Sequence, residues 1–227
     1  MAYHNGPRIV TDSLKLCLDP FNTKSYSGSG STVTDLSGNG NDFTIQGNVS
    51  WSASTGFSNF TGNSTGSGNK IYRDNFPTNL KTSQGGNGLT VMAWASSTAV
   101  GGWRKLIGNS DGENYIDLYQ HSASPYGWHT DGDGATLYYG PGTSTPGNTY
   151  VINDGAWKCL WATNLNNGLT SNPTYALTIG NEPNSSPQGS NPYPWIGNIG
   201  MVLIYGKVLS TNEMIQNYNA TKSRYSL

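Results

Sequence analysis

Apolar residues recur at every second position in several short stretches of the chain. In 13–19, Leu14, Leu16 and Leu18 fall on one face of an extended segment, which is the pattern of a half-buried strand. The stretch 89–95 is apolar on both faces, as expected of a central strand, and Trp94 within it is predicted to be core. Further strands are predicted at 43–46, 104–107, 115–119, 136–139, 157–163, 175–179 and 199–205.

Turn-forming residues separate these stretches. Clusters of Asn, Asp, Ser and Gly occupy 109–112, 131–134 and 166–168, and the longer segments 22–41 and 47–69 are also polar. Many short strands divided by regular turns indicate an antiparallel sandwich or barrel. We interpret 131–134 as a plain hairpin turn.

One helix is predicted close to the end of the chain. Ser210 and Glu213 have the spacing of a capping box, and Met214, Ile215 and Tyr218 are spaced for one apolar helical face. No internal repeat or change of composition marks a second domain. We therefore divide the chain into an extended arm at 1–12, a single domain at 13–219 and a tail at 220–227.

Composition supports an all-β chain and excludes some partners. Of the 227 residues 30 are Gly and only 11% are charged, well below the usual quarter, which argues against many exposed helices. The net charge is −1 and no Lys/Arg cluster occurs, so a nucleic-acid partner is not expected. No apolar run is long enough to cross a membrane.

The first residues and the two cysteines bear on the compartment. The N-terminus lacks the basic and apolar regions of a signal peptide, so we expect synthesis in a cytoplasm without export. Cys17 and Cys159 each lie within an apolar run. Without a secretory signal, buried free thiols are expected rather than a disulfide.

Several segments in a fixed order carry a resemblance to a known family. They are 14–19, 35–41, 90–94, 177–181, 195–200, 202–205, 209–210 and 213–215. In this order the chain resembles the laminin G-like branch of the concanavalin A-like lectin/glucanase superfamily. The resemblance covers 13–219, least closely at 97–156, and implies an antiparallel β-sandwich (jelly roll) with one short C-terminal helix.

The two ends of the chain carry a narrower resemblance. Residues 5–12 and 217–225 resemble stand-alone structural proteins of marine and cyanobacterial tailed phages. This implies a virion protein, either a capsid decoration or a tail-associated subunit, made in the host cytoplasm and present in many copies among other virion proteins. The alternative is a carbohydrate-binding lectin or adhesin, and a virion lectin that binds host surface glycans would combine the two.

The arm at 1–12 is a candidate attachment device. Tyr3, Ile9 and Val10 are apolar, and Gly6 and Pro7 keep the segment out of regular structure. Such a segment gains by ordering on a neighbouring subunit. The alternative is an arm that folds back along its own sandwich.

The distribution of acidic residues argues against an enzyme. Retaining glycosidases need two carboxylates about 5–5.5 Å apart, which on this fold lie at alternating positions of one strand. Glu113, Glu182 and Glu213 are the only glutamates, and no predicted strand carries such a pair. We interpret His121 near Asp117, and His129 near Asp131, as ordinary solvated turns, and we predict no enzyme.

Two candidate binding sites remain. The first is a calcium site formed by Asp35, Asn39 and Asn41, because hard oxygen ligands suit that ion; the alternative is that these side chains cap turns. The second is an aromatic cluster near Asp117 whose rings would stack on sugars, anchor a protein interface or fill the core. Its members are Tyr115, Tyr119, His121, Tyr126, Trp128, His129, Asp131, Tyr138 and Tyr139.

Overall fold

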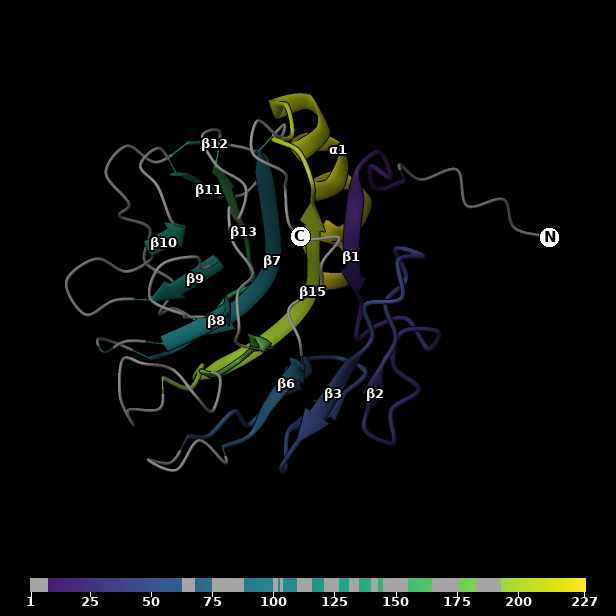
Figure 1. Ribbon diagram of the computed structural model, residues 1–227, viewed down its shortest axis with the longest axis vertical. Helices are drawn as coiled ribbons and strands as arrows, with labels where there is room; N and C mark the ends of the chain where they lie inside the picture. Colours follow the sequence, from purple (N-terminus) through teal and green to yellow (C-terminus); the bar gives the residue numbers. More distant parts are fainter. Residues whose placement is uncertain are drawn as a thin grey trace.

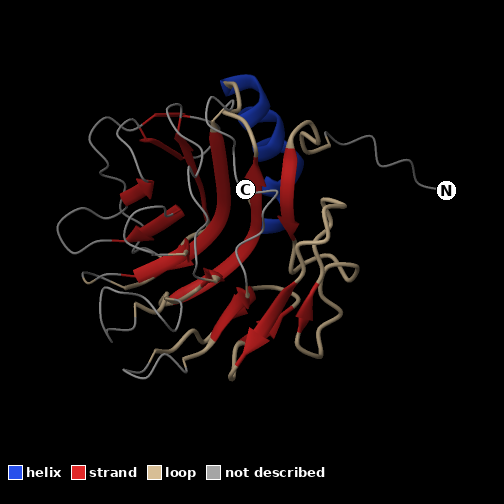
Figure 2. Ribbon diagram, in the orientation of Figure 1, coloured by secondary structure: helices blue, strands red, loops and turns tan. Residues whose placement is uncertain are grey.

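Two antiparallel sheets packed face to face make up the protein (Figures 1 and 2). The computed structural model describes residues 8–62, 68–74, 88–99, 102, 104–109, 116–120, 127–130, 135–139, 143–144, 155–164, 176–182 and 193–227. One short α-helix lies near the C-terminus. The predicted class, an all-β antiparallel sandwich with one C-terminal helix, is confirmed.

Sheet A holds eight of the described strands in the order β12-β11-β13-β7-β15-β5-β4, with β1 also paired to β15. Their bounds are β1 Leu14–Leu18, β4 Ser50–Ser52, β5 Gly56–Ser58, β7 Leu89–Ser97, β11 Ala135–Tyr139, β12 Thr143–Ser144, β13 Lys158–Asn164 and β15 Gly197–Tyr205. The two long strands β7 and β15 lie side by side in the middle of this sheet (Figure 1).

Sheet B holds the other seven described strands in the order β10-β9-β8-β14-β6-β3-β2. Their bounds are β2 Thr32–Val33, β3 Phe43–Gln46, β6 Lys70–Arg73, β8 Arg104–Gly108, β9 Ile116–Gln120, β10 Gly127–Thr130 and β14 Leu177–Ile179. The predicted hairpin turn at 131–134 lies outside the described residues, and the strands on either side of it, β10 and β11, belong to different sheets.

The core between the sheets is built by alternation along the strands, interrupted by register shifts in β8 and β15. In sheet B the facing positions of neighbouring strands carry one apolar row, which runs from β3 to β9. Its members in register are Ile45, Ile71, Ile179, Ile107 and Leu118. Sheet A meets this row with side chains such as Val91, Ala93 and Leu160, which are fully buried. Each large buried apolar side chain contributes about 1.5–3 kcal/mol.

A second core covers the outer face of sheet A. On β7, Met92 and Trp94 point away from the inner core and are fully buried. The Trp94 ring stacks on Tyr225 with a centroid separation of 4.1 Å, and its indole N–H donates to Thr221 at 2.9 Å. The prediction that Trp94 is core is therefore confirmed, and two cores explain why 89–95 is apolar on both faces.

Helix α1 (Thr211–Thr221) and the short 3-10 helix η2 (Lys222–Tyr225) cover that outer face. The predicted capping box is present, since Ser210 accepts from the N–H of Glu213 and the Glu213 side chain accepts from the N–H of Ser210. The buried residues of α1 are Met214, Asn217 and Thr221. The predicted apolar face therefore missed two polar residues, and Ile215 is only half-buried.

Both ends of the described chain belong to the domain. At the C-terminal end Tyr225 is buried and its hydroxyl accepts from the N–H of Met201 at 2.9 Å. A Cβ at Gly200 would lie 2.5 Å from this hydroxyl, so the close approach requires glycine there. Tyr225 and Thr221, both beyond the predicted domain boundary at 219, are buried, and they contact the outer core through the Tyr225 ring and the hydrogen bond from Trp94 to Thr221.

At the other end, the described part of the arm, 8–12, lies against its own domain. Val10 is buried and Ile9 packs against the same outer core. For Ile9 and Val10 the structure agrees with the second alternative, in which the arm folds back along its own sandwich. Tyr3 lies outside the described residues.

Cys17 and Cys159 are buried free thiols, as predicted. Burial raises the pKa of Cys17 to about 12, and it raises the pKa of Cys159 well above its usual value. None of the described helices is both long enough and apolar enough to cross a bilayer.

Candidate ligand-binding face of sheet B

The outer face of sheet B is polar where the inner face is apolar. One row crosses all seven strands in register and alternates with the apolar row behind it. Its members are Thr32, Thr44, Tyr72, Thr178, Gly108, Asp117 and His129. The described side chains of this row, Thr32, Thr44, Tyr72 and Thr178, therefore bring hydroxyl and phenol groups from four separate strands onto one face of one sheet.

Exposure along this row is uneven. Thr44 is exposed and Tyr72 is half-buried, whereas Thr178 is fully buried. The Thr178 hydroxyl lies 2.9 Å from the carbonyl oxygen of Gly108 and 2.6 Å from that of Asn181. The row is thus open on the β3–β6 side and closed by the chain itself at β14.

A buried ion pair lies beside the closed part of the row. Lys105 on β8 contacts Glu182, just after β14, at 2.7 Å between Nζ and Oε1. The two side chains are 4% and 9% exposed, so this pair lies in a region that excludes water. The main-chain N–H of Lys105 also donates to the carbonyl of Tyr193 at 2.8 Å. These contacts fix the turn after β14 against β8.

A second buried lysine, Lys70, lies beside the open part of the row. Lys70 on β6 is buried, and its Nζ lies 5.8 Å from the centroid of the Tyr72 ring. Burial lowers the pKa of Lys70 to about 8, and the negative charges of Asp74 and Glu182 partly oppose this. The Lys70 ammonium group therefore makes a cation–π contact with the Tyr72 ring.

The aromatic cluster predicted from the sequence is divided between different surfaces. In the backbone register of β9 and β10, Trp128 is paired with Leu118 and His129 with Asp117. Half-buried Tyr119 is opposite Lys105, on the outer face. The remaining members are not part of this face as described: Tyr138 and Tyr139 lie on β11 of sheet A, and Tyr115, His121, Tyr126 and Asp131 lie outside the described residues.

The predicted calcium ligand Asp35 is surrounded by hydrogen-bond donors. One carboxylate oxygen accepts from the N–H groups of Cys17 and Ser37, both at 2.9 Å. The other accepts from the N–H of Asn41 at 3.0 Å and from the Ser37 hydroxyl at 2.7 Å. A cation at either oxygen would have to displace these donors. These contacts correspond to the alternative prediction, in which the Asp35 side chain caps a turn.

The other two predicted ligands, Asn39 and Asn41, make similar hydrogen bonds along the free edge of β1. The amide nitrogen of Asn39 donates to the carbonyl of Leu14, and that of Asn41 donates to the carbonyl of Lys15, both at 2.9 Å. Alternating side chains of the loop thus satisfy the strand's outer backbone groups in place of a neighbouring strand. Among the described residues, no group of three or more His, Cys, Asp or Glu side chains is placed to hold a metal ion.

The described glutamates are occupied in structural contacts. Glu182 pairs with Lys105, and Glu213 contacts Lys207 at 2.7 Å while capping the helix. Glu113 lies outside the described residues. Sequence reasoning missed Lys70, Tyr72, Lys105 and Thr178 as face residues. The alternation of Lys70, Ile71 and Tyr72 was visible in the sequence. Which of these side chains face outward can be decided only when the register with the apolar row is known.

Comparison with known proteins supports the fold. No protein-family model matches the sequence, and no curated protein sequence matches it. Solved structures do match. Domain 4 of AbnA, a GH43 extracellular arabinanase from Geobacillus stearothermophilus solved with arabinotriose, has a TM-score of 0.58 at 14% identity, covering 91% of this chain and 98% of that domain.

Two larger proteins contain a similar fold. The Trypanosoma rangeli sialidase solved with sialic acid has a TM-score of 0.58 at 10% identity, over 97% of this chain and 36% of the sialidase. The receptor binding domain of botulinum neurotoxin D has a TM-score of 0.54 at 13% identity, over 92% of this chain and 52% of that domain. At such identities the likeness shows the fold alone, a β-sandwich compatible with a lectin-like jelly roll. None of these three is described as a laminin G-like or phage protein.

Proposed function

We propose that this chain is a non-catalytic carbohydrate-binding module that holds its ligand on the outer face of sheet B. The observation that carries the proposal is the polar row in register, with Thr44 and Tyr72 at its open end. A ring gives a sugar an apolar platform, and neighbouring hydroxyl and carboxyl groups exchange hydrogen bonds with its hydroxyls. The structural neighbours support this, because an arabinanase domain was solved with arabinotriose and a sialidase with sialic acid.

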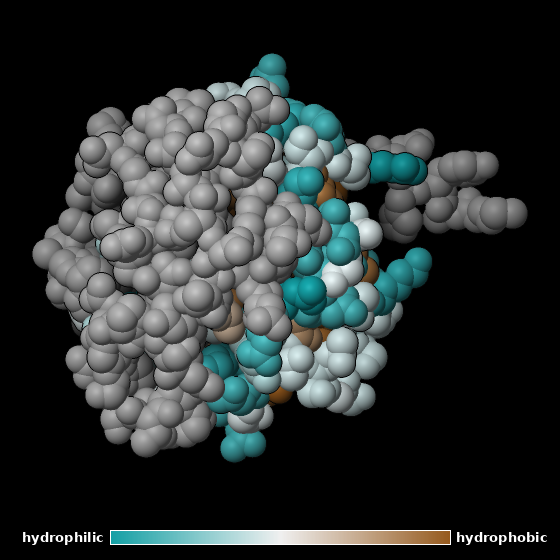
Figure 3. Space-filling model, viewed as in Figure 1, coloured by the Kyte–Doolittle hydropathy of each residue, from teal (hydrophilic) through white to brown (hydrophobic). Residues whose placement is uncertain are grey.

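The surface supports a polar ligand over an apolar one. Among the described residues, the only large hydrophobic side chains that are exposed are Ile196 and Leu227, at 44% and 54%. Figure 3 shows the described part of one face as mostly hydrophilic to neutral, with hydrophobic residues scattered singly. The described surface therefore has no broad apolar patch of the kind that marks an obligate protein interface.

The test is a binding screen with neutral glycans, including arabinan oligosaccharides, and with sialylated glycans. For any glycan that binds, Tyr72→Ala should weaken affinity about tenfold, as expected if ~1.4 kcal/mol of ring contact is lost. Tyr218→Ala, the same change on helix α1 beyond the opposite sheet, is the matched control and should leave affinity unchanged. Absence of binding across the screen, or equal losses in both variants, would contradict the proposal.

The absence of catalysis is part of the proposal. It is supported by the contacts that occupy Glu182 and Glu213, and by the missing carboxylate pair on the predicted strands. Laminarin, agarose and xylan should release no reducing ends with the protein. Turnover that disappears in Glu113→Gln would overthrow this part of the proposal.

A finer proposal concerns the carrier of the module. The resemblance of 5–12 and 217–225 to phage structural proteins, with the laminin G-like pattern at 13–219, supports a virion surface subunit made in the host cytoplasm. In that setting many copies on one particle would bind host surface glycans with high avidity. Mass spectrometry of purified particles should find the chain in many copies, and its absence from particles would refute this part.

A further inference from the structure

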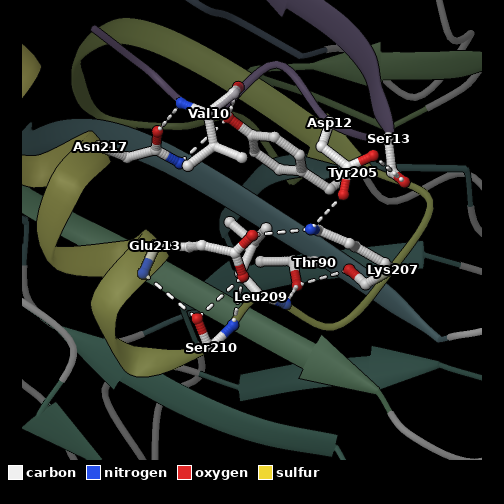
Figure 4. A network of polar contacts seen from close by, with 10 residues as sticks. All are labelled: Val10, Asp12, Ser13, Thr90, Tyr205, Lys207, Leu209, Ser210, Glu213 and Asn217. Carbon is white, nitrogen blue, oxygen red and sulfur yellow. Dashed lines mark hydrogen bonds and ion pairs between the residues drawn. The ribbon is translucent and has the colours of Figure 1, made fainter.

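The N-terminal segment 8–12 is held against β15 and α1 mainly through its backbone (Figure 4). The side-chain oxygen of Asn217 accepts from the N–H of Val10 at 2.7 Å, and the Tyr205 hydroxyl donates to the Val10 carbonyl at 2.9 Å. The amide of Asn217 donates in turn to the Tyr205 hydroxyl at 3.0 Å. The three groups form a closed ring of hydrogen bonds around one residue of the segment.

Further contacts lie on both sides of Val10. The Gln216 amide donates to the Arg8 carbonyl at 2.8 Å, and Lys207 forms an ion pair with Asp12 at 2.6 Å. Val10 is buried in the outer core while Ile9 packs at its margin. We call the surface that contacts this segment, formed by Tyr205, Lys207, Gln216 and Asn217, the groove; it supplies backbone, apolar and charged contacts.

The link between this segment and the first strand is short and strained. Ser13 has φ +60°, in the left-handed region that L-residues other than Gly, Asn and Asp rarely adopt. A turn closes over it, with the Leu14 N–H donating to the Thr11 carbonyl at 3.2 Å. The Ser13 carbonyl is already fixed by the N–H of Gly206 at 2.8 Å. Rotation about the Ser13 φ angle to an extended value relieves the strain, swings out 8–12 and leaves β1 in the sheet.

We propose that the groove also binds residues 8–12 of a second copy of this chain, so that two copies exchange these segments and form a domain-swapped dimer. The complementarity needs no new surface, because every contact in the groove is remade with an identical segment. A short hinge under strain favours this exchange. The closed monomer wins when the protein is dilute, and the exchanged dimer gains at high local concentration.

The test uses one double variant, Arg8→Cys with Gln216→Cys, prepared in unlabelled and 15N-labelled form. Both new cysteines lie at exposed positions, whereas the native thiols are buried. The two forms are mixed from micromolar to millimolar concentration and treated with a short bis-maleimide. Exchange predicts cross-linked peptides that join position 8 of one isotope to position 216 of the other, in a fraction that rises with concentration. Cross-links confined to a single isotope at every concentration would overturn the proposal.

Two controls separate exchange from collision and from misfolding. Arg8→Cys combined with Ala53→Cys, an exposed site on another part of the molecule, sets the yield of random contacts, which mixed-isotope 8–216 links must exceed severalfold. Ser13→Val, which disfavours positive φ, should raise the dimer fraction severalfold by size exclusion, and Ser13→Gly should lower it. If both hinge variants fold by circular dichroism and neither shifts the dimer fraction, the strained hinge is not the driver and the proposal fails.

Discussion

The two outer faces of the sandwich differ in what covers them. The outer face of sheet A is aromatic and sulfur-rich, with Trp94, Trp161 and Met92 fully buried under α1, η2 and the segment 8–12. The outer face of sheet B has the polar row instead, open at Thr44 and Tyr72. Both faces arise from the same alternation of side chains along strands, so the difference lies in the residues at every second position.

This difference separates stability from recognition. On sheet A a change at an outer position removes core contacts, and the free energy of unfolding should fall. On sheet B a change at the open end removes surface contacts. Ligand binding should weaken there, while the free energy of unfolding changes little. The two faces therefore make matched test sites within one molecule.

The largest expected effect is on the outer face of sheet A. Trp94→Ala removes a fully buried ring that stacks on Tyr225 and donates to Thr221, which should cost about 3–5 kcal/mol of unfolding free energy. Tyr72→Ala on the other face should cost less than about 1 kcal/mol, because the ring is only half-buried. Denaturant unfolding of both variants measures the contrast. Equal losses would show that the face of sheet B is a second structural core and not a ligand-binding surface.

Much of the fold could be predicted because long strands carry a clear period. The segment 89–95 was apolar on both faces, and β7 is covered by a core on each side. The strands that sequence reasoning missed are β2, β4, β5, β6, β10 and β12, which have two to four residues. So short a segment contains too few alternations to show a period, and the pairing of Trp51 with Phe57 across β4 and β5 depends on distant β15.

The candidate site was less predictable than the fold. The ion pair of Lys105 with Glu182 joins residues far apart in the chain, so neither residue carries a local signal. The burial of Asn217 and Thr221 was not predicted, because the sequence does not show that distant Val10 and Trp94 are their hydrogen-bond partners. In 35–41 the polar side chains were visible in the sequence, but their contacts with the free edge of β1 appear only in the structure.

An intermediate effect is expected at Asp35, beside the free edge of β1 in sheet A. Asp35→Ala removes an acceptor of four hydrogen bonds and leaves the buried N–H of Cys17 without its partner, which should cost about 2 kcal/mol. Asp35→Asn keeps one acceptor oxygen and should cost less. Melting curves in EDTA and in excess calcium should coincide for the wild type and for each variant. A wild-type melting temperature that rises with calcium, and a smaller rise in Asp35→Ala, would instead establish the calcium site.

The smallest effect concerns pH and the ion pairs that hold the segment 8–12 and the helix start on sheet A. The pKa of Glu213 is lowered from its usual 4.5, first by the hydrogen bond from Lys207 and then by that from the N–H of Ser210. A lowered carboxyl pKa gives stability that is present above the unfolded value of 4.5 and is lost as pH falls through the lower folded value. The melting temperature should therefore drop slightly below about pH 4.5, and less steeply in Glu213→Gln, which keeps an acceptor for Ser210. The Lys207 and Glu213 side chains are 19% and 27% exposed, so solvent still reaches the pair and high salt should shrink the difference between the two proteins. Identical pH profiles for both at low salt would show that this ion pair contributes nothing to closure of the outer face.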